Sequence, residues 1–176
     1  MNLIATAPLV VVMGVSGCGK STVGALLAHA LHADFLEGDL RHPPRNVALM
    51  AAGVALTDAD RHAWLLALAA DLQRAAGASR GLVVSCSALK RSYRDLLRNA
   101  STQLVFVHLH ADARVLGARM AARVGHYMPA SLLASQLATL EAPGTGERAV
   151  TLDAALPAAS VVAQALAWLV ARDDTQ

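Results

Sequence analysis

The sequence has few of the residues that mark a nucleic-acid-binding protein. Aromatic residues make up only 3% of the 176 residues, and the Lys and Arg residues, which outnumber the acids to give a net charge of +2, are dispersed along the chain. Proteins that bind nucleic acid normally carry a basic stripe or an aromatic stacking surface. The composition therefore argues against a nucleic-acid partner and favours a small anionic ligand.

The chain also lacks a cysteine framework and a long apolar run. Its two cysteines, Cys18 and Cys86, fit neither a set of disulfides nor a zinc site, so we expect small buried residues, with a redox role near the glycine loop as the alternative. Although 55% of the residues are hydrophobic, polar residues interrupt every apolar stretch before it reaches membrane-spanning length. Residues 1–8 carry no Lys or Arg and do not resemble a secretory signal. We expect a cytoplasmic protein without a membrane segment.

What the sequence does contain is a regular alternation of strand-length apolar runs and helical patterns. The expected strands are residues 9–13, 34–37, 81–86, 104–109 and 149–153. The expected helices are residues 21–31, 57–76, 90–98, one capped by Asp112, one ending near 140, and 157–170, whereas the two prolines within 41–45 predict a loop. Such alternation is typical of βαβ units, so we predict one α/β domain over residues 1–176, with a parallel five-stranded sheet in three α/β/α layers.

A glycine-rich loop follows the first expected strand. The segment GVSGCGKS, residues 14–21, fits the G-x-x-x-x-G-K-[ST] pattern, in which backbone N–H groups wrap a polyphosphate because bulky side chains are absent. Lys20 would reach the β and γ phosphates, and the Ser21 hydroxyl would bind Mg²⁺. The residues expected to bind the nucleotide here are Gly14, Val15, Ser16, Gly17, Cys18, Gly19, Lys20, Ser21 and Thr22.

Two further absences narrow the class of phosphate-binding protein. The third expected strand ends without an Asp, which nucleotide-hydrolysing switches and motors use to bind metal, and no Asn-Lys-x-Asp segment is present to read guanine. These absences favour a kinase that phosphorylates a small molecule. Its acid should lie at another strand end, where open α/β sheets bind ligands, and Asp39 follows the second strand.

Several blocks together resemble the gluconokinase family. They are FLEGDLRHPPRN at 35–46, then Met50, Gly53, Leu56, Asp58 and DRHAWL at 60–65, SCSALKRSYRDLLR at 85–98, GHY at 125–127 and LEAP at 140–143. They occur in the family's order and span nearly all of residues 10–153. The chain departs from the family at Glu37, where Asp is more frequent, and at Val124, where Lys is frequent.

The resemblance implies ATP-dependent phosphorylation of D-gluconate at its 6-hydroxyl, with Mg²⁺ as cofactor. It also implies a P-loop kinase fold like that of the nucleoside-monophosphate kinases, a mobile lid at about residues 119–130, and a homodimer. In the lid, Arg119 would bind the nucleotide, Arg123 would bring positive charge to the transferred phosphoryl group, and His126 would contact the substrate. Alternatively, Arg119 and Arg123, four residues apart, form a solvated helix face.

Asp39 is the candidate catalytic acid, together with Lys20 and Arg123 as catalytic cations. It would accept a hydrogen bond from the attacking hydroxyl and take its proton; the alternatives are that it caps a turn or binds Mg²⁺ through water. Arg61 is the preferred partner for the gluconate carboxylate, although a surface ion pair with Asp58 or Asp60 is equally compatible with its position. The remaining expected substrate ligands are His42, Arg45, Lys90 and Arg94.

Two other functions are compatible with the glycine loop. One is a small-molecule kinase of the shikimate-kinase type, which shares the loop and sheet but lacks these blocks as a set. The other is a nucleotide-binding sensor that transfers no phosphate, although a sensor would be expected to have lost Asp39 or Lys20, and both are present.

Overall fold

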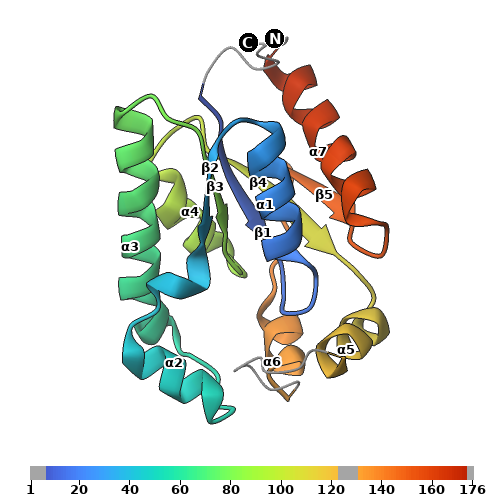
Figure 1. Ribbon diagram of the computed structural model, residues 1–176. Helices are drawn as coiled ribbons and strands as arrows, with labels where there is room; N and C mark the ends of the chain where they lie inside the picture. The colour runs from blue at the N-terminus through green and yellow to red at the C-terminus, as the bar shows by residue number, and fades with distance from the viewer. Residues whose placement is uncertain (1–6, 123–130, 174–176) are drawn as a thin grey trace.

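The computed structural model describes residues 7–122 and 131–173, and in them the strands form one five-stranded parallel sheet (Figure 1). The strand order is β2-β3-β1-β4-β5, and every neighbouring pair is parallel. The strands are β1 Leu9–Met13, β2 Asp34–Glu37, β3 Leu82–Ser85, β4 Val105–His110 and β5 Ala149–Asp153. The parallel five-stranded sheet predicted from the alternation is thus confirmed.

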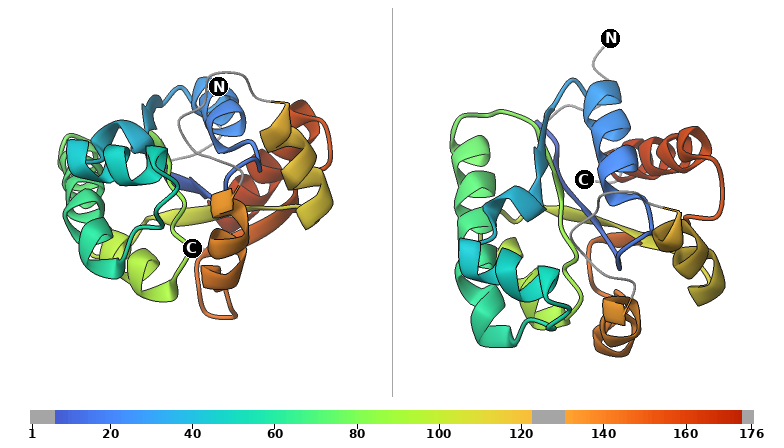
Figure 2. Two further views of the ribbon diagram at one scale, coloured as in Figure 1. Left: turned by 90° about the horizontal axis from the view of Figure 1, so that it is seen from below. Right: turned by 60° about the horizontal axis from the view of Figure 1, so that its bottom comes forward.

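The helices in the described residues divide into two groups. Figure 1 shows α1 and α7 on one face of the sheet and α3 and α4 on the other, which gives the three layers, whereas α2, α5 and α6 lie near the carboxyl ends of the strands. Figure 2, seen from that end, shows these three helices around the end of β1. Their bounds are α1 Lys20–Ala30, a 3₁₀ turn η1 Gly38–Arg41, α2 Pro44–Ala51, α3 Asp58–Gly77, α4 Arg91–Arg98, α5 Ala113–Ala121, α6 Ser131–Thr139 and α7 Ala158–Asp173.

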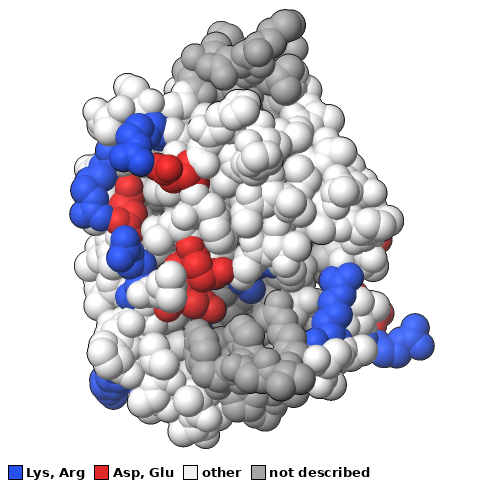
Figure 3. Space-filling model, viewed as in Figure 1, with Lys and Arg blue, Asp and Glu red and all other residues white. Residues whose placement is uncertain are grey.

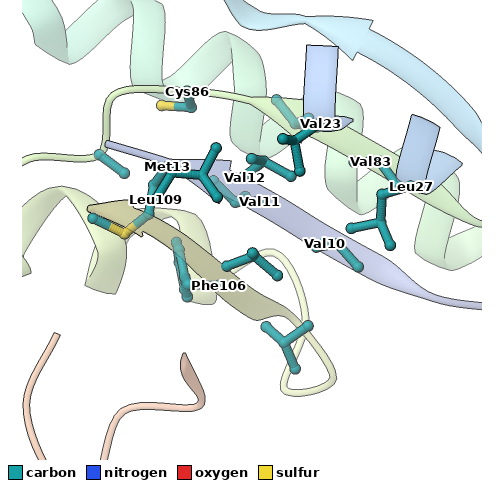
Figure 4. Packing of buried hydrophobic residues seen from close by; sticks show 14 of the residues in the cluster. Val10, Val11, Val12, Met13, Val23, Leu27, Val83, Cys86, Phe106 and Leu109 are labelled. Atoms are coloured by element: carbon teal, nitrogen blue, oxygen red, sulfur yellow. The ribbon is translucent and has the colours of Figure 1, made fainter. Parts of the chain in front are cut away.

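The core is built around the central strand β1. All five residues of Leu9–Met13 are buried, because helices cover both faces of a parallel sheet, and the run of valines suits such a strand. Leu27 of α1 belongs to the same buried cluster as this strand, and so does Phe106 of β4, the strand paired with β1 (Figure 4). Burying side chains of this size contributes about 1.5–3 kcal/mol each, so this strand anchors the loop that follows it.

The start of α3 follows the sequence signal closely. The Thr57 hydroxyl accepts a hydrogen bond from the Asp60 backbone N–H at 3.2 Å, while the Asp60 carboxylate accepts one from the Thr57 N–H at 3.0 Å. Thr followed three residues later by an acid is the residue pattern of a capping box, and here it satisfies two N–H groups that the helix itself leaves without a partner.

The prediction of a loop over residues 41–45 is wrong in part. Pro44 is the first residue of α2 and Pro43 its N-cap. Proline is favoured at the first helical position, since its missing N–H would have no partner there and its fixed φ suits a helix. The two prolines therefore start a helix.

Charged side chains of both signs are intermixed on the face shown in Figure 3. The ion pairs of the described residues include Arg41 with Asp71, at 2.7 Å, and Arg80 with Asp34. None of the helices in residues 7–122 and 131–173 is long and apolar enough to cross a membrane.

Candidate active site

The glycine loop connects β1 to α1 and is closely packed beneath. Gly14 has φ of +140°, and a Cβ built there would lie 2.6 Å from the Leu109 carbonyl oxygen and 2.8 Å from Cys18 Sγ. Any other residue at position 14 would therefore be strained and would displace the loop. The sequence thus fixes a backbone path in which the loop turns directly off the central strand.

The amino end of α1 leaves donors open to an anion. Its N-cap is Gly19, in the left-handed conformation, with no side-chain cap and no acidic residue in the first turn. The helix dipole and the free N–H groups together make such an end a site for phosphate. Lys20 Nζ donates a hydrogen bond to the Val15 carbonyl at 3.0 Å, so the lysine lies folded over the loop, and Ser21 is exposed.

A second close approach places Asp39 at the end of β2. A Cβ on Gly38 would lie 2.0 Å from the Ser85 carbonyl oxygen, so only glycine lets the chain pass this close to the end of β3. Glu37, which precedes it, accepts a hydrogen bond from the Ser85 hydroxyl, and the Gly38 N–H donates to the same hydroxyl at 3.1 Å. Asp39 then lies in η1 with its side chain 34% exposed.

One cavity brings together several residues that the sequence singled out. Lys20, Asp39, His42 and Arg61 all line it. Its remaining lining residues are Ser16, Met50, Ala55, Leu56, Ser87, Leu132, Ser135 and Gln136. The lysine of the phosphate loop, the candidate acid Asp39 and the cation Arg61 therefore line one cavity, as expected for phosphoryl transfer.

His42 is held rigidly in this cavity. Its ring stacks on Trp64, with centroids 4.1 Å apart and an interplanar angle of 16°. Burial lowers the pKa of His42 to about 4; nearby Asp39 opposes this and Arg61 adds to it. The imidazole is therefore neutral near pH 7. Trp64 is buried, and its Nε1–H donates to the Gly38 carbonyl at 2.8 Å, which ties α3 to the turn carrying Asp39.

Arg61 lines the cavity and has no carboxylate partner among the residues that the structure describes. It is buried, donates from Nε to the Leu56 carbonyl at 3.4 Å, and lies 5.9 Å from the centre of the Tyr93 ring. It forms no ion pair with a carboxylate of residues 7–122 or 131–173, because Asp58 pairs with Lys90 and Asp60 with Arg45. The alternative of a surface ion pair for Arg61 is therefore not what the structure contains.

Three other expected substrate ligands do not line the cavity. Arg45 is 79% exposed and lies 3.4 Å from Asp60. Lys90 Nζ contacts both carboxylate oxygens of Asp58 at 2.8 Å. Arg94 is fully buried in an ion pair with Glu147. Their nearness to the motifs in sequence suggested a shared site, but each cation already has a carboxylate partner elsewhere.

A second cavity lies on the other side of the glycine loop. It is lined by loop residues Gly17, Cys18 and Gly19, by Thr22 and Arg119, and by apolar residues that include Leu156 and Val161. Arg119, predicted to bind the nucleotide, thus lines the same cavity as three residues of the loop. Arg123 and His126, with most of the expected lid, lie outside the described residues.

Sequence reasoning missed one polar residue that lines the cavity of Lys20 and Asp39 (the acceptor cavity) and one that contacts a lining residue. The Gln136 side chain, on α6, accepts a hydrogen bond from the Ser16 N–H of the glycine loop at 2.6 Å. Asn46, on α2, is buried and contacts His42. No local signal marks Gln136, which is 120 positions from Ser16. Asn46 ends the HPPRN segment, and its place in that block was the signal that could have been followed. His108 of β4 is buried, with Nδ1 3.1 Å from Thr151 Oγ1.

Comparison with known proteins gives a consistent assignment. The AAA domain family matches residues 9–143. The gluconokinase of Gluconobacter oxydans is 53% identical over 137 residues, covering 78% of this chain and 77% of that protein, and the thermoresistant gluconokinase of Escherichia coli is 45% identical over 160 residues, covering 89% and 90%. The crystal structure of a gluconokinase from Sinorhizobium meliloti superposes with a TM-score of 0.87 at 48% identity, covering 97% of this chain and 95% of that one. With these blocks, this fold and these relatives, the chain belongs to the gluconokinase family of P-loop kinases.

Proposed function

We propose that the protein transfers the terminal phosphoryl group of ATP to the 6-hydroxyl of D-gluconate, giving 6-phosphogluconate and ADP. The observation that carries this proposal is the cavity in which Asp39 and Arg61 lie beside Lys20 of the phosphate loop, in a chain 53% identical to a gluconokinase. The shikimate-kinase type and the sensor are not favoured, because the relatives of high identity are gluconokinases.

The two cavities suggest how the substrates are arranged. ATP would place its base in the cavity lined by Thr22 and Arg119 and its phosphates over the glycine loop. Gluconate would occupy the cavity lined by Asp39 and His42, with its carboxylate on Arg61, because a guanidinium binds a carboxylate through two parallel hydrogen bonds. The reacting hydroxyl and the terminal phosphate would then meet near Lys20.

In the transfer, Asp39 accepts the hydrogen bond of the attacking hydroxyl and takes its proton as the new O–P bond forms and the bond to ADP breaks. Lys20 balances charge on the phosphates; this requires its Nζ to leave the Val15 carbonyl or to share it. Arg123, outside the described residues, would add positive charge as part of the lid, and His126 would close over the substrate.

The oxygen donors present fit Mg²⁺, which prefers hard ligands and keeps several waters. Ser21 would bind the ion directly and Asp39 through water; within the described residues no cluster of three or more acidic, His or Cys side chains forms a closed metal site. An ion held this way, chiefly by phosphates and water, supplies charge neutralisation.

The test compares gluconate, shikimate and a nucleoside monophosphate as acceptors, with ATP and Mg²⁺. We expect turnover with gluconate alone, and turnover with either other acceptor but not gluconate would overturn the proposal. Asp39→Asn should keep nucleotide binding and lower kcat by about 10²–10⁴-fold. Asp95→Asn, at an exposed carboxylate on α4, is the matched control.

The proposal extends to the assembly and location that the family resemblance implies. The protein would be a cytoplasmic homodimer, one domain per chain, with a lid at about 119–130. Light scattering of the purified protein measures the assembly directly, and a monomer at micromolar concentration would contradict it.

A further inference from the structure

Asn46 is a buried amide beside His42, which lines the acceptor cavity. It lies in the first turn of α2 and is only 3% exposed. Its Nδ2 lies 2.7 Å from the Asp60 carbonyl oxygen and 3.4 Å from Nδ1 of His42. A buried amide with defined partners on both an adjacent helix and a cavity residue has a fixed orientation.

The hydrogen-bond partners of Asn46 determine which atom of its side-chain amide is the nitrogen and which is the oxygen. A backbone carbonyl oxygen can only accept, so the atom 2.7 Å from Asp60 must be the NH₂ group. The same NH₂ group can only donate to His42. Nδ1 of His42 must therefore be the acceptor, without a proton.

This leaves the ring proton of neutral His42 on Nε2. That nitrogen lies 4.0 Å from Oδ1 of Asp39. The stacked ring of Trp64 fixes the orientation of the His42 ring. One donor, His42 Nε2–H, and one acceptor, the Asp39 carboxylate, thus face the same part of the cavity.

Two such atoms can be bridged by a single hydroxyl. A hydroxyl oxygen about 2.8 Å from both would see them at an angle of about 90°, close to the angle between its own proton and a lone pair. It would donate to Asp39 and accept from His42. Its second lone pair would remain unoccupied and its direction would be set.

We propose that Asn46 is a positioning residue that keeps the ring proton of His42 on Nε2, so that His42 and Asp39 together orient one substrate hydroxyl with a free lone pair directed at the phosphate loop. This rests on the proposed function for the identity of the hydroxyl, the 6-hydroxyl of gluconate. The placement of the ring proton does not depend on it.

The key experiment reverses the polarity at position 46. Asn46→Asp presents an acceptor to Nδ1 and draws the ring proton there, so kcat for gluconate should fall by about tenfold or more with a smaller change in KM. Asn46→Ala removes the donor without offering an acceptor, so it should lower kcat for gluconate less than Asn46→Asp does. Asn99→Asp, the same change at an exposed residue after α4, is the matched control.

Replacing the ring separates positioning from general damage. The amide nitrogen of Gln can reach the place of Nε2, whereas that of Asn reaches the place of Nδ1, so His42→Gln should retain more kcat than His42→Asn. In the His42→Gln background, Asn46→Asp should cost little, because no ring proton remains to be misplaced. Equal losses in the two His42 variants, or an undiminished cost of Asn46→Asp, would overturn the proposal.

The proton can also be located without any assay of activity. Long-range ¹H–¹⁵N correlation of the ring nitrogens in ¹⁵N-histidine-labelled protein, near neutral pH and without substrate, distinguishes the two tautomers, and His42→Gln assigns the signal among the seven histidines. We expect Nε2–H in the native protein. A proton on Nδ1 would refute the inference even if gluconate is the substrate, and Nε2–H would uphold it even if gluconate is not.

Discussion

Replacing Arg94 with methionine should destabilise the fold but leave Arg61, a cation that lines the acceptor cavity, in place. Arg94 is fully buried, and its Nε and Nη2 donate to the two carboxylate oxygens of Glu147 at 2.7 and 2.9 Å. Its Nη1 donates to the carbonyls of Ala88, at 3.0 Å, and Glu141, at 2.9 Å. The side chain thus joins α4 to the segment that leads from α6 to β5.

The expected loss of stability follows from the charge of Glu147, which stays buried after the substitution. Removing one partner of a buried ion pair costs about 3–5 kcal/mol, since the other charge remains buried. Arg98 Nη2 still donates to Glu147 at 2.5 Å, which favours the lower end, about 3 kcal/mol. For a chain of this size each kcal/mol lowers Tm by about 2–4 °C, so we expect a decrease of about 6–12 °C.

Urea unfolding and gluconate kinetics of the same variant give the two readouts. Arg94→Met/Glu147→Leu should recover most of the stability, because a buried ion pair can be replaced by apolar side chains at little cost. KM for gluconate should change less than it does in Arg61→Met. A loss below about 1 kcal/mol combined with a large rise in KM would show that Arg94 is a substrate ligand, as its place in the sequence first indicated.

Three further predictions follow from the site and its supports. Arg61→Met should raise KM for gluconate by about tenfold or more with little effect on KM for ATP, measured in steady-state assays, and unchanged gluconate KM would contradict its role as carboxylate partner. Gly14→Ala should abolish nucleotide binding in titration calorimetry, because the added Cβ would lie 2.6 Å from the Leu109 carbonyl; near-native affinity would contradict the strained geometry. The hydrogen bonds from Arg94 lower the pKa of Glu147 from 4.5 to about 2, so its contribution is complete above pH 4.5 and is lost as the pH falls towards 2. We expect acidification to remove about 2 kcal/mol from the free energy of unfolding, which is less than the full pKa shift corresponds to because solvent reaches Arg98. Unfolding curves that show the same acid dependence in Arg94→Met/Glu147→Leu would contradict this.

The parts of the fold that could be predicted from sequence are those with local signals. The apolar run of β1, the glycine loop and the Thr57 capping box each depend on neighbours within a few residues, and all three are present as expected. Asp39 was predicted from a general rule, since the carboxyl ends of parallel strands meet at one edge. The structure places it on the wall of the same cavity as Lys20.

The parts that could not be predicted depend on partners far away in the chain. Arg94 and Lys90 lie in a block that resembles a substrate site, yet the partner of Arg94 is Glu147, 53 positions later, and that of Lys90 is Asp58, 32 positions earlier. Whether a cation faces a ligand or a carboxylate is decided by such distant contacts. Periodicity and motif spacing carry no information about them.

The segment His42 to Asn46 shows how a local feature can be correctly noticed and wrongly interpreted. Two consecutive prolines suggest an irregular loop, but Pro43 and Pro44 fix φ at the N-cap and first position of α2. The Asn46 N–H then bonds to the Pro43 carbonyl at 2.9 Å, so the amide of Asn46 is held within reach of both His42 and the first turn of α3. The prolines reduce the freedom of the unfolded segment and so lower the entropic cost of this arrangement. A stiff helix start, rather than a flexible loop, is therefore what holds the groups opposite Asp39 in place.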